Sequence, residues 1–364
     1  MSRLVRSDEH RLPHRLEIGP LGLGGNGFKR GSESELLEIL KYASSHSVKF
    51  IETSNNQENR HLLPEAAQTE SRIARLMDEV GMPFFVSAKS NSTRGEELVR
   101  DFLASRRRFG SRLKWFLLHG VNDFNDLSDR TLGGAVDALA NLRSKYGIGI
   151  GFSSHSIPVA KKLMTAKDFD LVELSINIIN RRADIEEWVA KLVRDDVFVV
   201  AMSPLAGGLI PALEVLYEGL LEENLAYLQW LGAVAVPTVS SVSHLRRLIN
   251  VGLKQGISFS DDKEGSIQRL LSIGSLGDGI CSSCQQCMPC LERGYYSGAV
   301  RLALAFEFMC LGLREKSEEI WSSYKCSDLP CETCRIVEQC CIRGLNIQAR
   351  FKALKKSVTQ ENGL

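Results

Sequence analysis

The feature that most constrains the fold of this chain is a repeated alternation of short apolar runs with helix-period segments. From about residue 32 onward, amphipathic segments are followed by runs rich in aliphatic and aromatic residues. This alternation is typical of parallel strands joined by crossover helices. We expect strands at Leu21–Gly24, Lys49–Thr53, Phe84–Ala88, Trp115–Leu118, Gly149–Phe152, Leu171–Ser175, Phe198–Ala201 and Ala233–Val236.

The segments between these runs predict amphipathic helices, among them Ser32–Ala43, Asp184–Val193 and Val242–Gly252. Ser32 and Glu35 have the spacing of a capping box, which marks the start of a helix. Eight strands with intervening helices predict an α/β fold, a closed (β/α)8 TIM barrel. A doubly wound open sheet is the alternative, but the glycine-rich stretch at 21–28 is not expected to open a helix, as the GxGxxG fingerprint of that fold does, so a pyrophosphate loop is weakly supported.

The length of 364 residues leaves room for a second module, because such a barrel needs about 250 residues. The polar, acidic segment 258–264 is loop-like. We therefore predict a barrel over residues 1–257 and a cysteine-rich module with a helical tail over residues 258–364.

Charge and hydropathy limit the partners that we expect. The 45 Lys and Arg residues nearly balance the 44 Asp and Glu residues, so no broad field favours nucleic acid or an anionic membrane surface. No stretch approaches the roughly 18 apolar residues that a spanning helix needs. A cytoplasmic protein that binds a small molecule or another protein is the resulting expectation.

Three polar residues stand at the ends of neighbouring apolar runs. Glu52 ends KFIET, Lys89 ends FFVSAK, and His119 follows WFLL. Active-site groups of a (β/α)8 barrel gather at the carboxyl ends of its strands. A lysine and a carboxylate that hold each other's charge, beside an imidazole that donates a hydrogen bond, suit the polarisation of a carbonyl group.

All ten cysteines lie between residues 281 and 341, which indicates metal ligation in a reducing compartment. Cys310 lies in an apolar helical segment and is expected in a core. The regular CxxCxxCxxC run predicts one 4Fe-4S cluster, and the looser second set could hold another. Structural zinc is the alternative. The candidate ligands are Cys281, Cys284, Cys287, Cys290, Cys326, Cys331, Cys334, Cys340 and Cys341.

The segments KFIETS, SAK, LLHG, IGFSSHS, ELSINIINR, MSPLAGGL and VPTVSS occur in an order that resembles the aldo/keto reductase family over roughly residues 15–255. The resemblance implies catalytic roles for Glu52 at the family's aspartate, Lys89 at its lysine and His119 at its histidine. Gln57 stands where the family has its proton-donor tyrosine. A glutamine amide donates hydrogen bonds but cannot release a proton, so we expect His119, Glu58 or a water to replace the tyrosine.

The resemblance also implies an NADPH site across the strand ends. Ser154 replaces the family's asparagine, Glu173 its glutamine, and Ile176 an aromatic residue that often stacks on the nicotinamide. His155 is expected to have a structural role at a helix start. The implied cofactor-binding residues are Ser153, Ser154, Glu173, Asn177, Ser203, Leu205, Gly208, Ser240 and Ser241.

The module around Cys281–Cys290 resembles the ferredoxin-like tail that is fused to some aldo/keto reductases. The resemblance implies an oxidoreductase that acts on a small organic or peptide-borne substrate with NADPH, iron-sulfur clusters or both. It also implies a possible redox partner protein. Two other functions stay open: a catalytically degenerate barrel that binds a partner, and an electron-transfer protein that uses its clusters.

Overall fold

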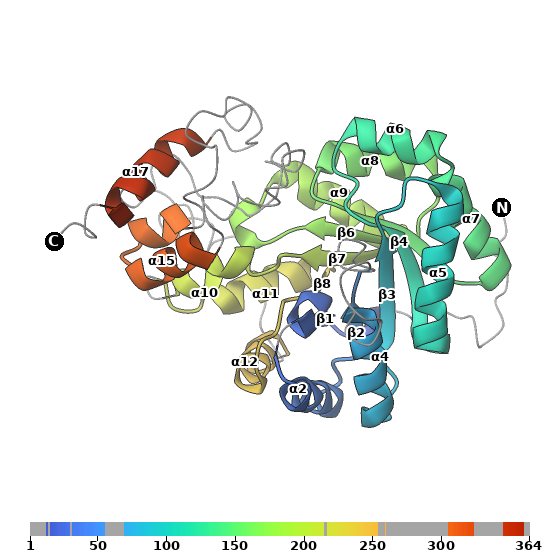
Figure 1. Cartoon of the computed structure of the whole chain (residues 1–364), viewed down its shortest axis with the longest axis horizontal. Helices are drawn as coiled ribbons and strands as arrows, with labels where there is room; N and C mark the ends of the chain where they lie inside the picture. Colours follow the sequence, from blue (N-terminus) through green and yellow to red (C-terminus); the bar gives the residue numbers. More distant parts are fainter. Residues whose placement is uncertain are drawn as a thin grey trace. The chain divides into compact units, whose positions relative to one another are not determined.

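The strands of this computed structural model form one parallel sheet whose order follows the sequence, β1 to β8 (Figure 1). The structure describes residues 12–13, 15–29, 31–54, 69–214, 217–253, 259, 305–323 and 345–359. The strands in this part of the chain are β1 (Leu23–Gly24), β2 (Phe50–Glu52), β3 (Phe85–Ser90), β4 (Leu113–Leu118), β5 (Gly149–Ser154), β6 (Leu171–Ser175), β7 (Phe198–Met202) and β8 (Val234–Ala235).

Hydrogen bonds between the last strand and the segment around the first strand close the sheet. The amide of Gly22 donates to the carbonyl of Ala235 at 2.8 Å, and the amide of Ala235 donates to Pro20 at 2.9 Å. The amide of Gly24 donates to Pro237 at 2.9 Å. The predicted eight-stranded parallel barrel is therefore confirmed, and the open-sheet alternative is wrong.

Some strands begin or end at other residues than the sequence predicts, because a polar residue can continue the hydrogen-bonded ladder and an apolar residue can lie outside it. The run at β5 was expected to end at Phe152, but Ser153 and Ser154 continue the ladder and pair with Glu173 and Leu174. β8 is shorter than expected. Pro237 follows closely after Ala235, and its ring nitrogen has no hydrogen to donate to a ladder.

Helices follow most strands, as the alternation predicts. Ser32 and Glu35 form the expected capping box of α2, in which Glu35 accepts from the amide of Ser32 at 2.9 Å. None of the described helices is long and apolar enough to span a bilayer. The elements around the strands are α1 (Arg15–Ile18), η2 (Gly25–Lys29), α2 (Glu33–Ser45), α4 (Thr69–Val80), α5 (Gly95–Phe109), η4 (Gly110–Arg112), α6 (Phe124–Leu132), α7 (Ala135–Tyr146), α8 (Ile157–Ala166), α9 (Ala183–Arg194) and α12 (Val242–Gly252).

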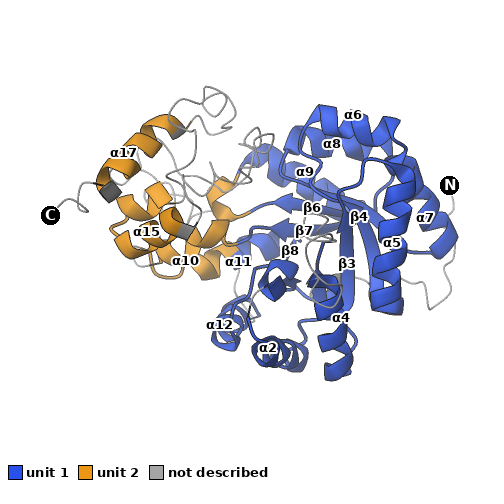
Figure 2. Cartoon of the chain, viewed as in Figure 1, with its two compact units in different colours: residues 1–176, 182–204, 225–257 blue, residues 177–181, 205–224, 258–364 orange. Residues whose placement is uncertain are grey.

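The chain divides into two compact units (Figure 2). Unit 1 comprises residues 1–176, 182–204 and 225–257, and unit 2 comprises residues 177–181, 205–224 and 258–364. Unit 2 thus combines the C-terminal part with two segments that follow β6 and β7. The division into domains at residue 258 stays a prediction, because nearly all of residues 254–304 lie outside the described part.

Unit 2 contains the remaining elements: η5 (Ile178–Asn180), η6 (Ala206–Gly208), α10 (Leu209–Leu213), the start of α11 (Leu220–Trp230), α15 (Arg314–Ser323) and α17 (Ile347–Thr359). The rings of Trp321 and Phe351 pack with centroids 5.6 Å apart. Arg350 forms a buried ion pair with Glu307. Cys310, which was expected in a core, is half-buried at the end of a helical stretch over residues 305–310.

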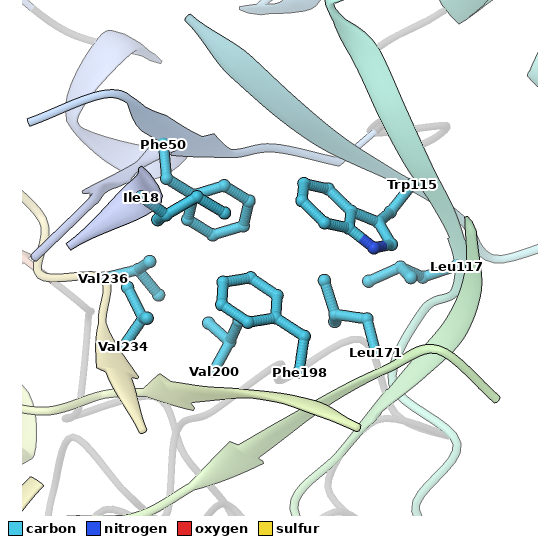
Figure 3. Packing of buried hydrophobic residues seen from close by; sticks show 9 residues of the cluster. All are labelled: Ile18, Phe50, Trp115, Leu117, Leu171, Phe198, Val200, Val234 and Val236. Atoms are coloured by element: carbon cyan, nitrogen blue, oxygen red, sulfur yellow. The ribbon is translucent and has the colours of Figure 1, made fainter. Parts of the chain in front are cut away.

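The core of unit 1 is built around three aromatic rings inside the barrel (Figure 3). Trp115 stacks on Phe198 with centroids 5.2 Å apart, and Phe50 meets both rings edge-on. Gly149 leaves the space that the Trp115 indole occupies, since a Cβ there would overlap the ring. The aliphatic members of the cluster are Ile18, Leu117, Leu171, Val200, Val234 and Val236.

Replacement of Phe50 by alanine should test this core. Phe50 is completely buried and touches both other rings, so Phe50→Ala should lower the free energy of unfolding by about 3–5 kcal/mol, as measured by urea denaturation. The control is Leu132→Ala, since Leu132 is 84% exposed and should change stability by no more than about 0.5 kcal/mol. Equal effects of both substitutions would contradict this view of the core.

Candidate functional site

Lys89 forms ion pairs with two carboxylates inside the barrel. Its Nζ donates to Oε1 of Glu52 in a short contact and to Oε2 of Glu173 at 2.6 Å. The side chains of Lys89, Glu52 and Glu173 are 3%, 14% and 0% exposed. The pair of Glu52 and Lys89 that the sequence predicts is therefore present, and Glu173 joins it as a second carboxylate.

Glu173 reaches Lys89 across the barrel interior. β3 and β6 are not neighbours in the sheet, because β4 and β5 lie between them. Ser87, two residues before Lys89, donates to Oε1 of Glu173 at 3.2 Å. Alternate residues of a strand share a face, so one face of β3 binds both oxygens of the Glu173 carboxylate.

The site contains one more carboxylate than ammonium groups, and this imbalance changes its titration. Burial, together with the negative charge of Glu52, raises the pKa of Glu173 to about 7, although the charge and hydrogen bond of Lys89 oppose the rise. Burial alone would lower the pKa of Lys89, but the carboxylates of Glu173 and Glu52 outweigh it and the pKa lies above its usual value. Lys89 therefore stays charged, while Glu173 can exchange a proton near neutral pH.

Two imidazoles lie near this cluster. His119 follows β4 and His155 follows β5. Burial, with the positive charges of Lys89 and Arg130 next, holds the pKa of His119 well below its usual range. Burial and the charge of Lys89 lower the pKa of His155 to about 4. Both rings are therefore neutral at pH 7.

Each of these histidines has an Nδ1 atom that is buried without a hydrogen-bond partner among the described residues. A neutral imidazole offers one donor and one acceptor nitrogen, so either ring could bind an oxygen-bearing ligand. His155 was expected to have a structural role, and its amide does donate to Oδ1 of Asn122 at 2.7 Å. Its unpaired ring nitrogen, however, makes it a candidate for ligand binding as well.

Arg130 holds the backbone around His119. This buried side chain of α6 donates to the carbonyl oxygens of His119 at 3.1 Å, Ser92 at 3.4 Å and Ser90 at 3.5 Å, and Asp126 binds its Nε at 2.8 Å. Arg130 is not among the site residues that the sequence predicts. A charged residue within an amphipathic helix carries no signal that it points inward until the tertiary structure is known.

Several of the expected cofactor-binding residues of unit 1 use their side chains for hydrogen bonds to backbone groups. Oγ of Ser153 accepts from the amide of Gly120 at 2.8 Å, and Oγ of Ser154 donates to the carbonyl of Val121 at 2.6 Å. Ser203 has a left-handed backbone, with φ of 48°. Ser241 caps α12 by accepting from the amide of His244 at 3.1 Å, and Ser240 beside it is exposed.

The other expected cofactor-binding residues belong to unit 2. The side chain of Asn177 accepts from the amides of Ile179 and Asn180 and thereby caps η5. Leu205 is buried, and its carbonyl accepts from the amide of Gly208 at 3.0 Å. Gly208 has φ of 97°, a conformation that favours glycine. The cofactor roles of Asn177, Leu205 and Gly208 stay predictions.

Two groups of expected site residues lie outside the described part of the chain. The first is Gln57, at the position of the family's tyrosine, with Glu58 beside it. The second is the full set of predicted cluster ligands: Cys281, Cys284, Cys287, Cys290, Cys326, Cys331, Cys334, Cys340 and Cys341. Among the residues that are described, no cluster of three or more His, Cys, Asp or Glu residues could hold a metal ion.

The comparison with known proteins points to one family. The model of the aldo/keto reductase family matches residues 20–229. No curated protein sequence matches the chain.

Several solved structures have a similar fold. One is an aldo-keto reductase from Bacillus halodurans in its holo form, which is 16% identical to this chain and has a TM-score of 0.55. The match covers 69% of this chain and 91% of that one. An aldo-keto reductase from Klebsiella pneumoniae in complex with NADPH has 16% identity and a TM-score of 0.53 over 71% of this chain and 93% of that one. An aldo/keto reductase from Brucella melitensis has 18% identity and a TM-score of 0.51 over 69% and 94% of the two chains. At these identities, the likeness shows a shared fold.

The protonation of His155 should test the electrostatics of the site. By NMR of labelled histidine, the ring should stay neutral from pH 8 down to about 5 and take up its proton near pH 4. Lys89→Met should raise this pKa, because it removes a neighbouring positive charge. The exposed control Lys41→Met should leave the titration unchanged. A midpoint near the ordinary value of about 6.5 would contradict the burial described here.

Proposed function

The chain belongs to the aldo/keto reductase family, a family of oxidoreductases, and from this premise we propose that it catalyses NADPH-linked reduction or oxidation at a carbonyl group. The substrate would be a small organic or peptide-borne molecule bound at the carboxyl ends of the strands. The single observation that carries the proposal is the buried cluster of Glu52, Lys89 and Glu173, with neutral His119 nearby.

The chemistry of these side chains suits a reacting carbonyl oxygen. A buried ammonium stabilises the negative charge that develops on the oxygen during hydride attack. The neutral ring of His119 can donate one hydrogen bond to the same oxygen, because the low pKa leaves one nitrogen protonated and the ring uncharged. Glu52 keeps Lys89 charged by pairing with it.

The donors on α12 fit an anionic cofactor such as NADPH. The helix begins at Val242 after its cap, Ser241, and Arg246 and Arg247 lie at its middle. Helix N-termini and arginines are favourable partners of phosphate groups. We therefore assign the phosphate end of the cofactor to Ser240, Ser241 and this helix. When bound, the cofactor would supply the hydride.

The proton donor must differ from that of the family. A glutamine at position 57 can hold a substrate oxygen by a hydrogen bond, but its amide does not release a proton at neutral pH. The proton therefore has to come from another group of the site.

The C-terminal cysteines support a second part of the proposal, which rests on the sequence alone. Four thiolates in CxxCxxCxxC spacing, Cys281 to Cys290, suit one 4Fe-4S cluster, and Cys326 to Cys341 could complete a second one. Such clusters would exchange electrons with a partner protein or with the barrel site. Zinc ligation by the same thiolates is the competing outcome.

A catalytically degenerate barrel that binds a ligand or a partner protein is the second candidate function. It is favoured because Ser154 and Asn177, at two expected cofactor contacts, use their side chains for hydrogen bonds to backbone groups. Ser154 donates to the carbonyl of Val121, and Asn177 caps η5. This candidate predicts a folded protein that neither binds NADPH nor turns over a carbonyl substrate. An electron-transfer protein would share these properties but would exchange electrons through its clusters.

Lys89→Met separates these functions. The wild-type protein should bind NADPH by fluorescence titration and oxidise it in the presence of aldehydes or ketones from a panel. Lys89→Met should lower this turnover by about 100-fold or more, because the ammonium beside the reacting oxygen is lost. Lys41→Met should leave turnover unchanged, because Lys41 is exposed on α2. Absence of NADPH binding by folded protein would favour the second candidate.

The metal content of anaerobically purified protein tests the C-terminal module. Iron and sulfide with a brown visible spectrum are expected, and bleaching on addition of NADPH would connect the clusters with the barrel. Zinc without sulfide would contradict the iron-sulfur proposal and leave the barrel proposal in place.

A further inference from the structure

Glu173 is the second carboxylate that pairs with Lys89. Glu52 already pairs with the ammonium, so Glu173 adds a negative charge that the site does not need for neutrality. An isolated charge inside a protein is costly, and carboxyl groups commonly avoid the cost by taking up a proton. Two carboxylates and one ammonium in a buried site should therefore hold one extra proton.

The geometry indicates which carboxyl group holds this proton. The side chain of Glu173 is 0% exposed, whereas that of Glu52 is 14% exposed at the end of β2. Burial penalises the ionised form more strongly at Glu173. Its Oε2 lies 2.6 Å from Nζ of Lys89, so a proton on Glu173 has a direct route to Lys89. The pKa of about 7 supports the same choice.

We propose that Glu173 stores the proton that the reduction consumes and delivers it through Lys89. The inference deepens the proposed function and rests on it for the reaction step. Glu173 would act as a positioning residue, because its fully buried carboxyl group reaches the substrate only through the lysine.

The reaction step balances as follows. When bound, NADPH would supply the hydride that bonds to the carbonyl carbon, and the carbonyl π pair would then move to the oxygen. The oxygen takes a proton from the ammonium of Lys89, and the resulting amine takes one from the carboxylic acid of Glu173. The net consumption is one hydride and one proton, and Glu173 ends as a carboxylate beside an ammonium. Solvent returns the proton through the partly exposed side of Glu52.

Among the described residues, the other titratable groups near the cluster do not offer this proton near pH 7. Lys89 on β3 has a raised pKa and stays charged, while His119 and His155 have lowered pKa values and stay neutral. Glu52 on β2 contributes by its negative charge, which raises the pKa of Glu173. The arrangement therefore leaves Glu173 as the proton store.

Infrared titration of the whole chain tests, without a substrate, whether Glu173 holds a proton. The C=O stretching band of a neutral carboxylic acid should be present at pH 6, lose half its intensity near pH 7 and be absent in Glu173→Gln. Glu52→Gln should keep the band but move its midpoint to lower pH, because a neighbouring negative charge is removed. The matched control is Glu70→Gln, a buried carboxylate on α4 that pairs with Arg108 and should not affect the band. Absence of the band from the wild type, or its survival in Glu173→Gln, would overturn the inference.

The pH profile of carbonyl reduction tests the role of the stored proton. Since the acid form is the donor, wild-type turnover should fall tenfold per pH unit above pH 7. Turnover by Glu173→Gln should be about 100-fold slower than that of the wild type at pH 6 and should not fall with pH above 7. Glu173→Asp should restore this fall with pH. A wild-type slope retained in Glu173→Gln would overturn the role in catalysis. A normal infrared titration in a protein without NADPH-linked turnover would instead count against the proposed function.

Discussion

The interior of this barrel depends on the buried ammonium of Lys89. Carboxylates from β2 and β6 bind it, and Ser87 on its own strand holds the second of them. Removal of one partner from a buried ion pair leaves an uncompensated charge that costs several kcal/mol. The closed sheet is what brings β3 and β6 together, so the charge network and the barrel support each other.

Apolar and polar layers follow one another along the strands. Phe50 and Glu52 on β2 share a face, as do Leu171 and Glu173 on β6, because alternate residues of a strand point to the same side. A residue of the hydrophobic cluster thus lies two positions before the charged residue on both strands. These buried apolar side chains lower the local polarity, so the ion pairs beside them are stronger than they would be in water. Stability and chemistry therefore occupy successive layers of one barrel.

Local patterns in the sequence predict much of the fold. Each of the eight apolar runs overlaps a strand, and the capping box of Ser32 and Glu35 and the helix Val242–Gly252 match the structure closely, because each depends on neighbouring residues. The pairing of Glu52 with Lys89 was also predictable, since both residues end adjacent strands. The partnership of Glu173 with Lys89 was not, because it joins strands that are far apart in the sequence and are not paired in the sheet. The sequence did single out Glu173 itself, as a charged residue inside the apolar run LVELS and at the place of the family's glutamine, but not its partner.

A double-mutant cycle between Lys89 and Glu173 tests the central claim most directly. The free energy of unfolding at pH 7.5 would be measured for the wild type, Lys89→Met, Glu173→Gln and the double variant. The ion pair predicts a coupling free energy on the order of 1–3 kcal/mol, with the double variant less destabilised than the sum of the single ones. Additive effects, within about 0.5 kcal/mol, would show that the two side chains do not interact and would contradict this account of the site.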